Sequence, residues 1–228
     1  MATPSLPPIT SLPTLPFSAQ LAALDTLFEP SPDLHTILQP ILSSASSNHP
    51  FQSYDTLIDT IHAQLSALST TTDPQQKQTL YNILGSHPCL GASSPAAQAG
   101  LSELSRREQA NINKSAENEQ QAEAAADQAV RLSKLNMEYE EKYPGLRYVY
   151  DPFPQVYFRS FFSYGRGLIG DRTWVNGRGR DVIMVDMRRR IDRGEFELEV
   201  RDNIEVCRIY STNIDRIDTS ANRGLGYV

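Results

Sequence analysis

Helical periodicity of the apolar residues is the feature that most limits what this chain can fold into. Apolar residues that recur every three or four positions predict an amphipathic helix, because such positions share one helical face. Three sets show the spacing: Leu21, Leu24, Leu27 and Phe28; Leu57, Ile58, Ile61 and Leu65; and Ile183, Met184, Met187 and Ile191. The alternation that marks a half-buried strand is nearly absent, so the sequence predicts an all-α fold, a single compact multi-helix domain.

Prolines and glycines divide the helical pattern into separate elements. Helices are predicted over residues 18–28, 34–42, 51–68, 74–84, about 105–143, 181–193 and 197–215. Residues 1–16 contain five prolines and few groups that could pack, which predicts a disordered tail. Residues 217–228 are expected to form a flexible C-terminal tail, so the folded domain is expected over 17–216.

The charge balance argues against a general nucleic-acid binder. The chain carries a formal net charge of −6 at pH 7, whereas contacts to phosphates need a basic surface. A run of three arginines at residues 188–190 lies between Asp186 and Asp192. This pattern is typical of a solvated helix face with ion pairs one turn apart. We therefore expect no nucleic acid among the partners.

Neither a membrane nor a metal is indicated. No stretch approaches the roughly 18–20 uninterrupted apolar residues of a membrane span, and residues 1–4 lack the character of a signal peptide. No clustered Cys/His spacing points to zinc, so Cys89 and Cys207 are expected to be reduced thiols. We expect a cytoplasmic protein, and a peroxisomal location stays open although no S-K-L signal ends the sequence.

The segment SHPCLG, at residues 86–91, places a histidine just beyond a predicted helix. Pro88 disfavours helical geometry at His87, so the ring is expected to follow the helix over 74–84. An imidazole titrates near neutral pH, which makes His87 a candidate general acid or base. Taken alone, however, an ordinary histidine with satisfied hydrogen bonds is the better interpretation.

Ser105, Glu108 and Gln109 form the pattern S-x-x-E-Q at the start of the predicted long helix. Positions three and four apart share a helical face, so a hydroxyl, a carboxylate and an amide could meet one ligand. The S-x-x-E part is also a capping box, in which Ser105 and Glu108 bind each other's backbone amides. On spacing alone the capping box is the stronger interpretation, and the ligand-binding one stays open.

Longer motifs extend these two signals along the chain. They are LFEPSP at 27–32, HPF at 49–51, HPCLG at 87–91, SRREQ at 105–109, LNMEYEEKYPGLRYV at 135–149 and WVNGRGRDVIMVDMRRRIDRGEFELE at 174–199. Together, from about Phe17 to Asp215, they resemble the OHCU decarboxylase family, the ureidoimidazoline decarboxylases of the urate-to-allantoin pathway. The spacing of HP-x-L-G, S-x-x-E-Q and L-N-x-x-Y is specific for this family, and the P-G-L-R-Y-V and V-N-G-R forms resemble its fungal branch.

The resemblance implies an all-helical enzyme without a cofactor, usually a homodimer, that acts on a small molecule. As a carboxy-lyase it would convert 2-oxo-4-hydroxy-4-carboxy-5-ureidoimidazoline to S-allantoin and carbon dioxide. Position by position, His87 matches the catalytic histidine and Glu108 its acidic partner. The family's substrate contacts match Pro88, Ser105, Gln109, Tyr148, Val149, Thr173, Trp174 and Val175. No metal is implied.

Two features depart from the family pattern. The last helix of relatives usually carries an arginine four residues after the position of Ile209, where this chain has Asn213. Residues 150–172 interrupt the substrate-binding segment between Val149 and Thr173 with an irregular, aromatic-rich insertion. Removing this insertion would leave an uninterrupted family sequence. We therefore hypothesise that it is a retained intron or a gene-model error.

These departures keep a second class of function open. A helical protein of the same fold with impaired catalysis could serve as an interaction or structural module. Activity on freshly made substrate would separate this alternative from the decarboxylase. A third interpretation, nucleic-acid binding through the arginine-rich last third, predicts strongly salt-dependent binding and conflicts with the acidic total charge.

Overall fold

The computed structural model describes residues 6–45, 51–91, 101, 105–106, 109–110, 119–149 and 180–222, without the side chains of 44–45, 119–125 and 213–222. Its longer elements are a 3₁₀-helix (Leu12–Thr14), α1 (Phe17–Leu27), α2 (Pro32–Ala45), α3 (Tyr54–Thr70), α4 (Pro74–Leu84), α7 (Glu119–Lys142), α9 (Arg180–Arg193) and α10 (Phe196–Asn222). All of these described elements are helices, so the expected all-α class is confirmed. No helix within the described residues is long and apolar enough to cross a membrane.

The start of α4 follows local capping chemistry, and this sets where the helix delivers the chain. The Asp73 carboxylate accepts a hydrogen bond of 2.8 Å from the backbone N–H of Gln75, and Pro74 occupies the first turn. Leu80 and Leu84 lie on the buried face. The helix ends at Leu84, so His87 follows it by three residues, as the sequence predicts.

Residues 6–16 differ from the expected disordered tail, because they pack against the helices. Leu6 and Leu12 are buried, and the Tyr54 hydroxyl of α3 donates a hydrogen bond of 2.8 Å to the Pro7 carbonyl. The Gln20 amide of α1 donates to two carbonyls of the same segment. A proline-rich segment has little backbone freedom to lose, so a few apolar side chains are sufficient to hold it.

Several helix boundaries also differ from the predictions. Helix α2 continues through Pro40 to Ala45, past the predicted end at residue 42. Helix α10 reaches Asn222, so residues 217–222 of the expected C-terminal tail are helical. Of the predicted long helix, residues 105–106, 109–110 and α7 are described and are helical, and residues 107–108 and 111–118 lie outside the described residues. The insertion at 150–172 lies outside the described residues.

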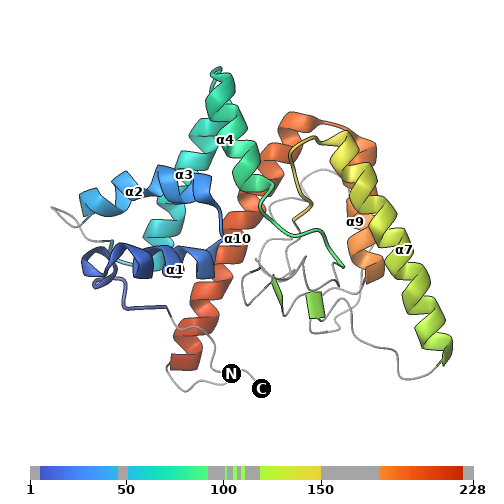
Figure 1. The fold of residues 1–228 in the computed structure, drawn as a ribbon, viewed down its shortest axis with the longest axis horizontal. Helices are drawn as coiled ribbons and strands as arrows, with labels where there is room; N and C mark the ends of the chain where they lie inside the picture. Colours follow the sequence, from blue (N-terminus) through green and yellow to red (C-terminus); the bar gives the residue numbers. More distant parts are fainter. Residues whose placement is uncertain are drawn as a thin grey trace, which may run out of the picture.

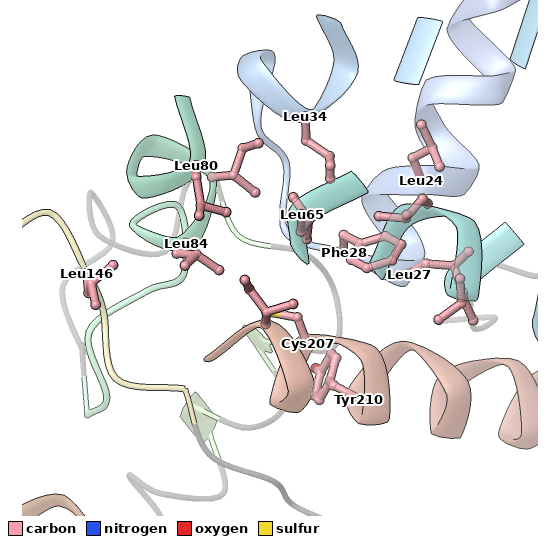
Figure 2. Close-up of a cluster of buried hydrophobic side chains, with 14 of the residues drawn as sticks. Leu24, Leu27, Phe28, Leu34, Leu65, Leu80, Leu84, Leu146, Cys207 and Tyr210 are labelled. Carbon is pink, nitrogen blue, oxygen red and sulfur yellow. The ribbon is translucent and has the colours of Figure 1, made fainter. Parts of the chain in front are cut away.

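Helix α10 is the central element of the fold. Figure 1 shows it running through the middle of the molecule, with α1, α2 and α3 on one side and α7 and α9 on the other. It packs against α3, α1 and α4, while α7 packs against α9. Side chains from α1 to α4 and from α10 meet in one buried cluster, which Figure 2 shows around Leu27, Leu65 and Cys207. The pocket described below lies beside this cluster.

A buried ion-pair network joins α7, α9 and α10. Arg190 of α9 lies 2.6 Å from the Glu199 carboxylate, which also accepts hydrogen bonds from Tyr139 at 2.5 Å and Arg193 at 2.7 Å. Arg190 is only 6% exposed, so the prediction of a solvated face is wrong for this arginine. It is right for its neighbour Arg189, which is exposed. A guanidinium is buried here because its charge is paired.

Candidate functional site

The turn that carries His87 is set by a close approach of two backbone segments. Gly85 ends α4, and a Cβ atom at this position would lie 2.5 Å from the Gly145 carbonyl oxygen. Only glycine permits this approach without a backbone shift. Gly145 itself has a positive φ of 86° and lies three residues after the end of α7. The end of α4 and the end of α7 therefore meet, and His87 emerges beside the segment that follows α7.

A pocket lies where these segments meet. The space between its walls, counted together with the open solvent at its mouth, is about 340 Å³. The lining residues are His87, Pro88, Leu90, Ser105, Gln109, Tyr148, Val149 and Tyr210. The structure thus brings together every predicted site residue that it describes. Glu108, Thr173, Trp174 and Val175 lie outside the described residues.

The loop after His87 is held by side chains from other elements. The Gln109 amide accepts a hydrogen bond of 2.8 Å from the Gly91 backbone and donates one of 3.2 Å to the Cys89 carbonyl. Asn136 of α7 donates to the Leu90 carbonyl at 2.9 Å. Because Gln109 is buried and uses both ends of its amide on the backbone, its contacts here are those of a brace for the loop.

Ser105 contacts a carboxylate that the sequence analysis did not select. Its hydroxyl donates a short hydrogen bond to Glu29, which is 4% exposed and lies two residues after the end of α1. A hydroxyl that donates still has lone pairs, so Ser105 can also accept a hydrogen bond from a backbone amide, as the predicted capping box requires. Glu108, the other residue of that capping box, lies outside the described residues. The signal for Glu29 was available: it is the one acidic residue in the motif LFEPSP.

The electrostatic environment of His87 combines two opposing influences. Burial of the ring lowers the pKa of His87, because the surroundings disfavour its charged form. The nearby charge of Glu29 acts in the opposite direction and raises the pKa. Since burial is the larger influence, the ring is neutral at neutral pH and can accept a proton, while Glu29 stabilises the imidazolium that results.

A second residue that the sequence analysis did not select touches the His87 ring. Cys207 of α10 places its Sγ 3.3 Å from Nε2 of His87. Burial raises the pKa of the Cys207 thiol to about 12, and the charge of Glu29 adds to this shift, so the thiol stays protonated. Cys207 continues the apolar stripe of Val200 and Ile204 along α10, which identifies it from sequence only as a core residue.

The opposite wall of the pocket is positioned by the buried ion-pair network. Arg190 donates a hydrogen bond of 2.9 Å to the Val149 carbonyl, and its guanidinium lies 4.8 Å from the centre of the Tyr148 ring. The Tyr148 hydroxyl donates to Asp186 at 2.7 Å. These contacts hold Tyr148 and Val149 toward the pocket from the side of α9.

The described part of the site offers proton transfer and hydrogen bonding. His87 supplies a neutral imidazole, Glu29 supplies a buried carboxylate, and the turn after α4 supplies backbone groups. Within the described residues no group of three His, Cys, Asp or Glu side chains could hold a metal ion. The arrangement can therefore bind a polar small molecule and move a proton on it.

Comparison with known proteins adds one match. A family model described as OHCU decarboxylase matches residues 13–152, which is more than half of the chain. The matched range contains all the described pocket residues except Tyr210, and it includes Glu29. Neither a curated protein nor a solved structure matches the chain.

Proposed function

The chain belongs to the OHCU decarboxylase family of urate catabolism, and we propose that it converts 2-oxo-4-hydroxy-4-carboxy-5-ureidoimidazoline to S-allantoin and carbon dioxide. The observation that carries the proposal is the single pocket shared by His87, Pro88, Ser105, Gln109, Tyr148 and Val149. These positions come from three separate parts of the sequence, and each matches a family site residue. Thr173, Trp174 and Val175 complete the proposed substrate-binding set.

The proposed reaction needs an electron acceptor and a directed proton, both of which are available without a cofactor. When the bond to the carboxylate breaks, its electron pair forms a C=C bond in the imidazoline ring and displaces the C=N electron pair onto the ring nitrogen. This nitrogen takes up one proton, which gives an enol. Protonation of the neighbouring ring carbon, with loss of the enol proton, then gives allantoin. His87 is the proposed general acid and base, because a neutral imidazole can take the enol proton and return one. Delivery from one face would fix the S configuration.

Two carboxylates are candidates for the acidic partner of His87. We propose Glu108 in this role, because it occupies the family position. Glu29 is an additional acid whose charge reaches the ring and whose oxygen holds Ser105. The two roles are compatible, since one carboxylate can orient the imidazole while the other stabilises its charged form.

Circular dichroism of allantoin formation tests the proposal directly. Urate, urate oxidase and hydroxyisourate hydrolase would generate the substrate in place. Two versions of the chain would be compared, the full sequence and one that lacks residues 150–172. An S-allantoin signal that appears faster than in the blank supports the function. The His87→Asn variant of the active version is the control, and it should fold normally yet give only the rate of the blank.

The outcome also tests the proposed nature of the insertion at 150–172. The family match ends at residue 152, just after the insertion begins, which supports an interruption of the family sequence there. If only the shortened chain is active, the insertion is an artefact or an inactivating element. Sequencing of the mature transcript decides between these two, because a retained intron would be missing from spliced messages.

The alternative proposal is a helical interaction or structural module that has lost catalysis. It is favoured by Asn213 in place of the family arginine and by the interrupted substrate-binding segment. Absence of turnover in both versions of the chain, with both correctly folded, would favour this alternative. An Asn213→Arg variant of the shortened chain would then show whether the missing arginine is the cause.

We also propose a homodimer in the cytoplasm, because dimers are usual in the family. Light scattering should give twice the chain mass of 25.5 kDa. A mass of one chain would contradict the dimer. Imaging of a fluorescently labelled full chain would test the compartment against the peroxisome.

A further inference from the structure

Two walls of the pocket come from distant parts of the sequence. We call them the histidine loop, residues 87–91, and the tyrosine segment, residues 146–149. They contribute His87, Pro88, Leu90, Tyr148 and Val149 to the lining. Figure 2 shows Leu84, at the end of α4 just before the histidine loop, on the same side of the cluster as Leu146, which begins the tyrosine segment. The width of the pocket therefore depends on how these two segments are held relative to each other.

Glu140 of α7 contacts both segments. Its carboxylate accepts a hydrogen bond of 3.0 Å from the Cys89 thiol of the histidine loop and forms an ion pair with Arg147 of the tyrosine segment. Both contacts involve the same carboxylate oxygen, Oε1. Asn136, one turn earlier on the same face of α7, donates to the Leu90 carbonyl at 2.9 Å. This face of α7 therefore ties the two walls together.

The backbone of each segment is anchored separately by other side chains. Gln109 donates a hydrogen bond of 3.2 Å to the Cys89 carbonyl, and Asn203 of α10 donates one of 3.2 Å to the Arg147 carbonyl. Each of these two contacts holds one segment, whereas Glu140 is bonded to both. Loss of the Glu140 carboxylate would therefore leave each segment anchored and the fold largely intact, but it would remove a direct link between the walls.

We propose that Glu140 is a positioning residue that sets the width of the pocket by joining its two walls through Cys89 and Arg147. The inference rests on the proposed decarboxylation for its effect on turnover, but the link itself stands independently. It gives α7 a role outside the set of family site residues. The side chains of Arg147 and Glu140 are 33% and 36% exposed, so their ion pair contributes little to stability. Its effect is therefore expected in substrate binding.

Alkylation of Cys89 by iodoacetamide tests the link without any substrate. Burial raises the pKa of the Cys89 thiol to about 11, and the hydrogen bond to Glu140 adds to this shift. Because the thiolate is the reactive form, Glu140→Ala should raise the rate of alkylation at about pH 8 by roughly threefold or more. Mass spectrometry of the peptide that contains Cys89 measures this rate.

The next residue of α7 supplies the matched control. Glu141 is exposed, so Glu141→Ala changes the charge of the helix by the same amount and should leave the alkylation rate of Cys89 unchanged. Equal rates in wild type and Glu140→Ala, or the same increase in both variants, would overturn the proposal.

Turnover tests the functional part. Glu140→Ala should raise KM about three- to tenfold, which is the size expected for the loss of one modest hydrogen bond. Its kcat should stay within about twofold of wild type, because His87 keeps its own contact with Cys207. Glu140→Gln should restore part of KM, since its amide oxygen still accepts from the Cys89 thiol. A purely structural role predicts lower stability with an unchanged KM, and that result would overturn the proposal.

A double-mutant cycle with Arg147 separates one link from two independent effects. Arg147→Ala breaks the same link at its other end. Its combination with Glu140→Ala should therefore raise KM by less than the product of the two single effects, and a full product would contradict the link. If the wild-type chain shows no decarboxylation, the proposed function fails, and the alkylation rates still decide whether Glu140 holds the histidine loop.

Discussion

At the scale of single residues, the protonation state of His87 is set by groups that lie far from it in the sequence. Burial in the pocket lowers the pKa of the ring, and the charge of Glu29 partly opposes this effect. Cys207 adds a hydrogen-bonding partner at Nε2. A ring that is neutral at rest but lies near a carboxylate can both take and return a proton, which the proposed reaction requires.

The lowered pKa of His87 predicts a contribution to the pH dependence of stability. The unfolded chain binds a proton at this residue as the pH falls through about 6.5, whereas the folded chain resists protonation. The free energy of unfolding should therefore fall on acidification below about 6.5, until the folded ring also protonates. In His87→Asn this part of the slope should vanish. Urea unfolding of both proteins across this range measures it, and equal slopes would contradict the pKa shift.

Replacement of Glu29 by glutamine should lower the pKa of His87 further. Glu29→Gln keeps the shape of the side chain and an acceptor for Ser105, but it removes the negative charge that favours the imidazolium. Proton NMR of the His87 ring as a function of pH measures the change. Glu197→Gln is the matched control, because Glu197 is exposed on α10 and pairs with Lys77. An unchanged His87 pKa in Glu29→Gln would show that Glu29 does not act on the ring.

At the scale of elements, the loop after α4 depends on Gln109. Gln109→Ala removes two hydrogen bonds to the backbone of Gly91 and Cys89 and should cost about 1–3 kcal/mol of stability. It should also raise KM, because Pro88 and Leu90 lose their fixed positions at the pocket. Gln78→Ala is the control: Gln78 is exposed on α4 and donates a hydrogen bond to Asn82 one turn further on, so its loss should cost less than about 0.5 kcal/mol. Equal losses in the two variants would contradict the bracing role.

The junction of α9 and α10 allows a comparison of two consecutive arginines. Arg190→Ala would leave Glu199, which is fully buried, with less compensation for its charge and should cost about 3–5 kcal/mol. Because Glu199 stays paired with Arg193 in this variant, we expect a loss of stability near the lower end of this range. Arg189→Ala removes an exposed pair with Asp186 and should cost less than about 1 kcal/mol. Chemical denaturation of both variants provides the test, and a small loss in Arg190→Ala would contradict the role of the network.

At the scale of the whole molecule, α10 links the two sides of the fold. It packs on α1, α3 and α4, and its residues Glu199 and Asn203 bind α7 and α9 through Tyr139 and Arg190. An element shared in this way couples the unfolding of both sides.

We therefore expect one cooperative thermal transition for the described helices. The NMR signals of His35, which lies on α2 and contacts Asp25 of α1, and of His87, at the pocket, should disappear at the same midpoint as the far-UV signal of helix. Arg190→Ala, on the far side of α10, should lower the His35 midpoint by the same amount as the helix signal. Separate midpoints would show that the two sides unfold independently.

The sequence by itself determined the local features of this protein. Helical class, the apolar stripes and the position of His87 after α4 depend on periodicity and on the geometry of proline and glycine, which act over a few residues. The order of the motifs was also sufficient to indicate the family. The same local signals misjudged residues 6–16 and Arg190, because composition predicts exposure on average and does not report which group a side chain will meet.

Only the tertiary structure decided which groups surround the histidine. Ser105 meets Glu29 across 76 positions of sequence, and His87 meets Cys207 across 120. Neither pair has a local signal, because each depends on how α1, α4 and α10 pack. The physical reason is that a helix pattern specifies which face is buried, while the packing of three helices specifies what that face touches. The ring and its family acid Glu108 were visible in the sequence, but the influence of Glu29 and the contact with Cys207 were not.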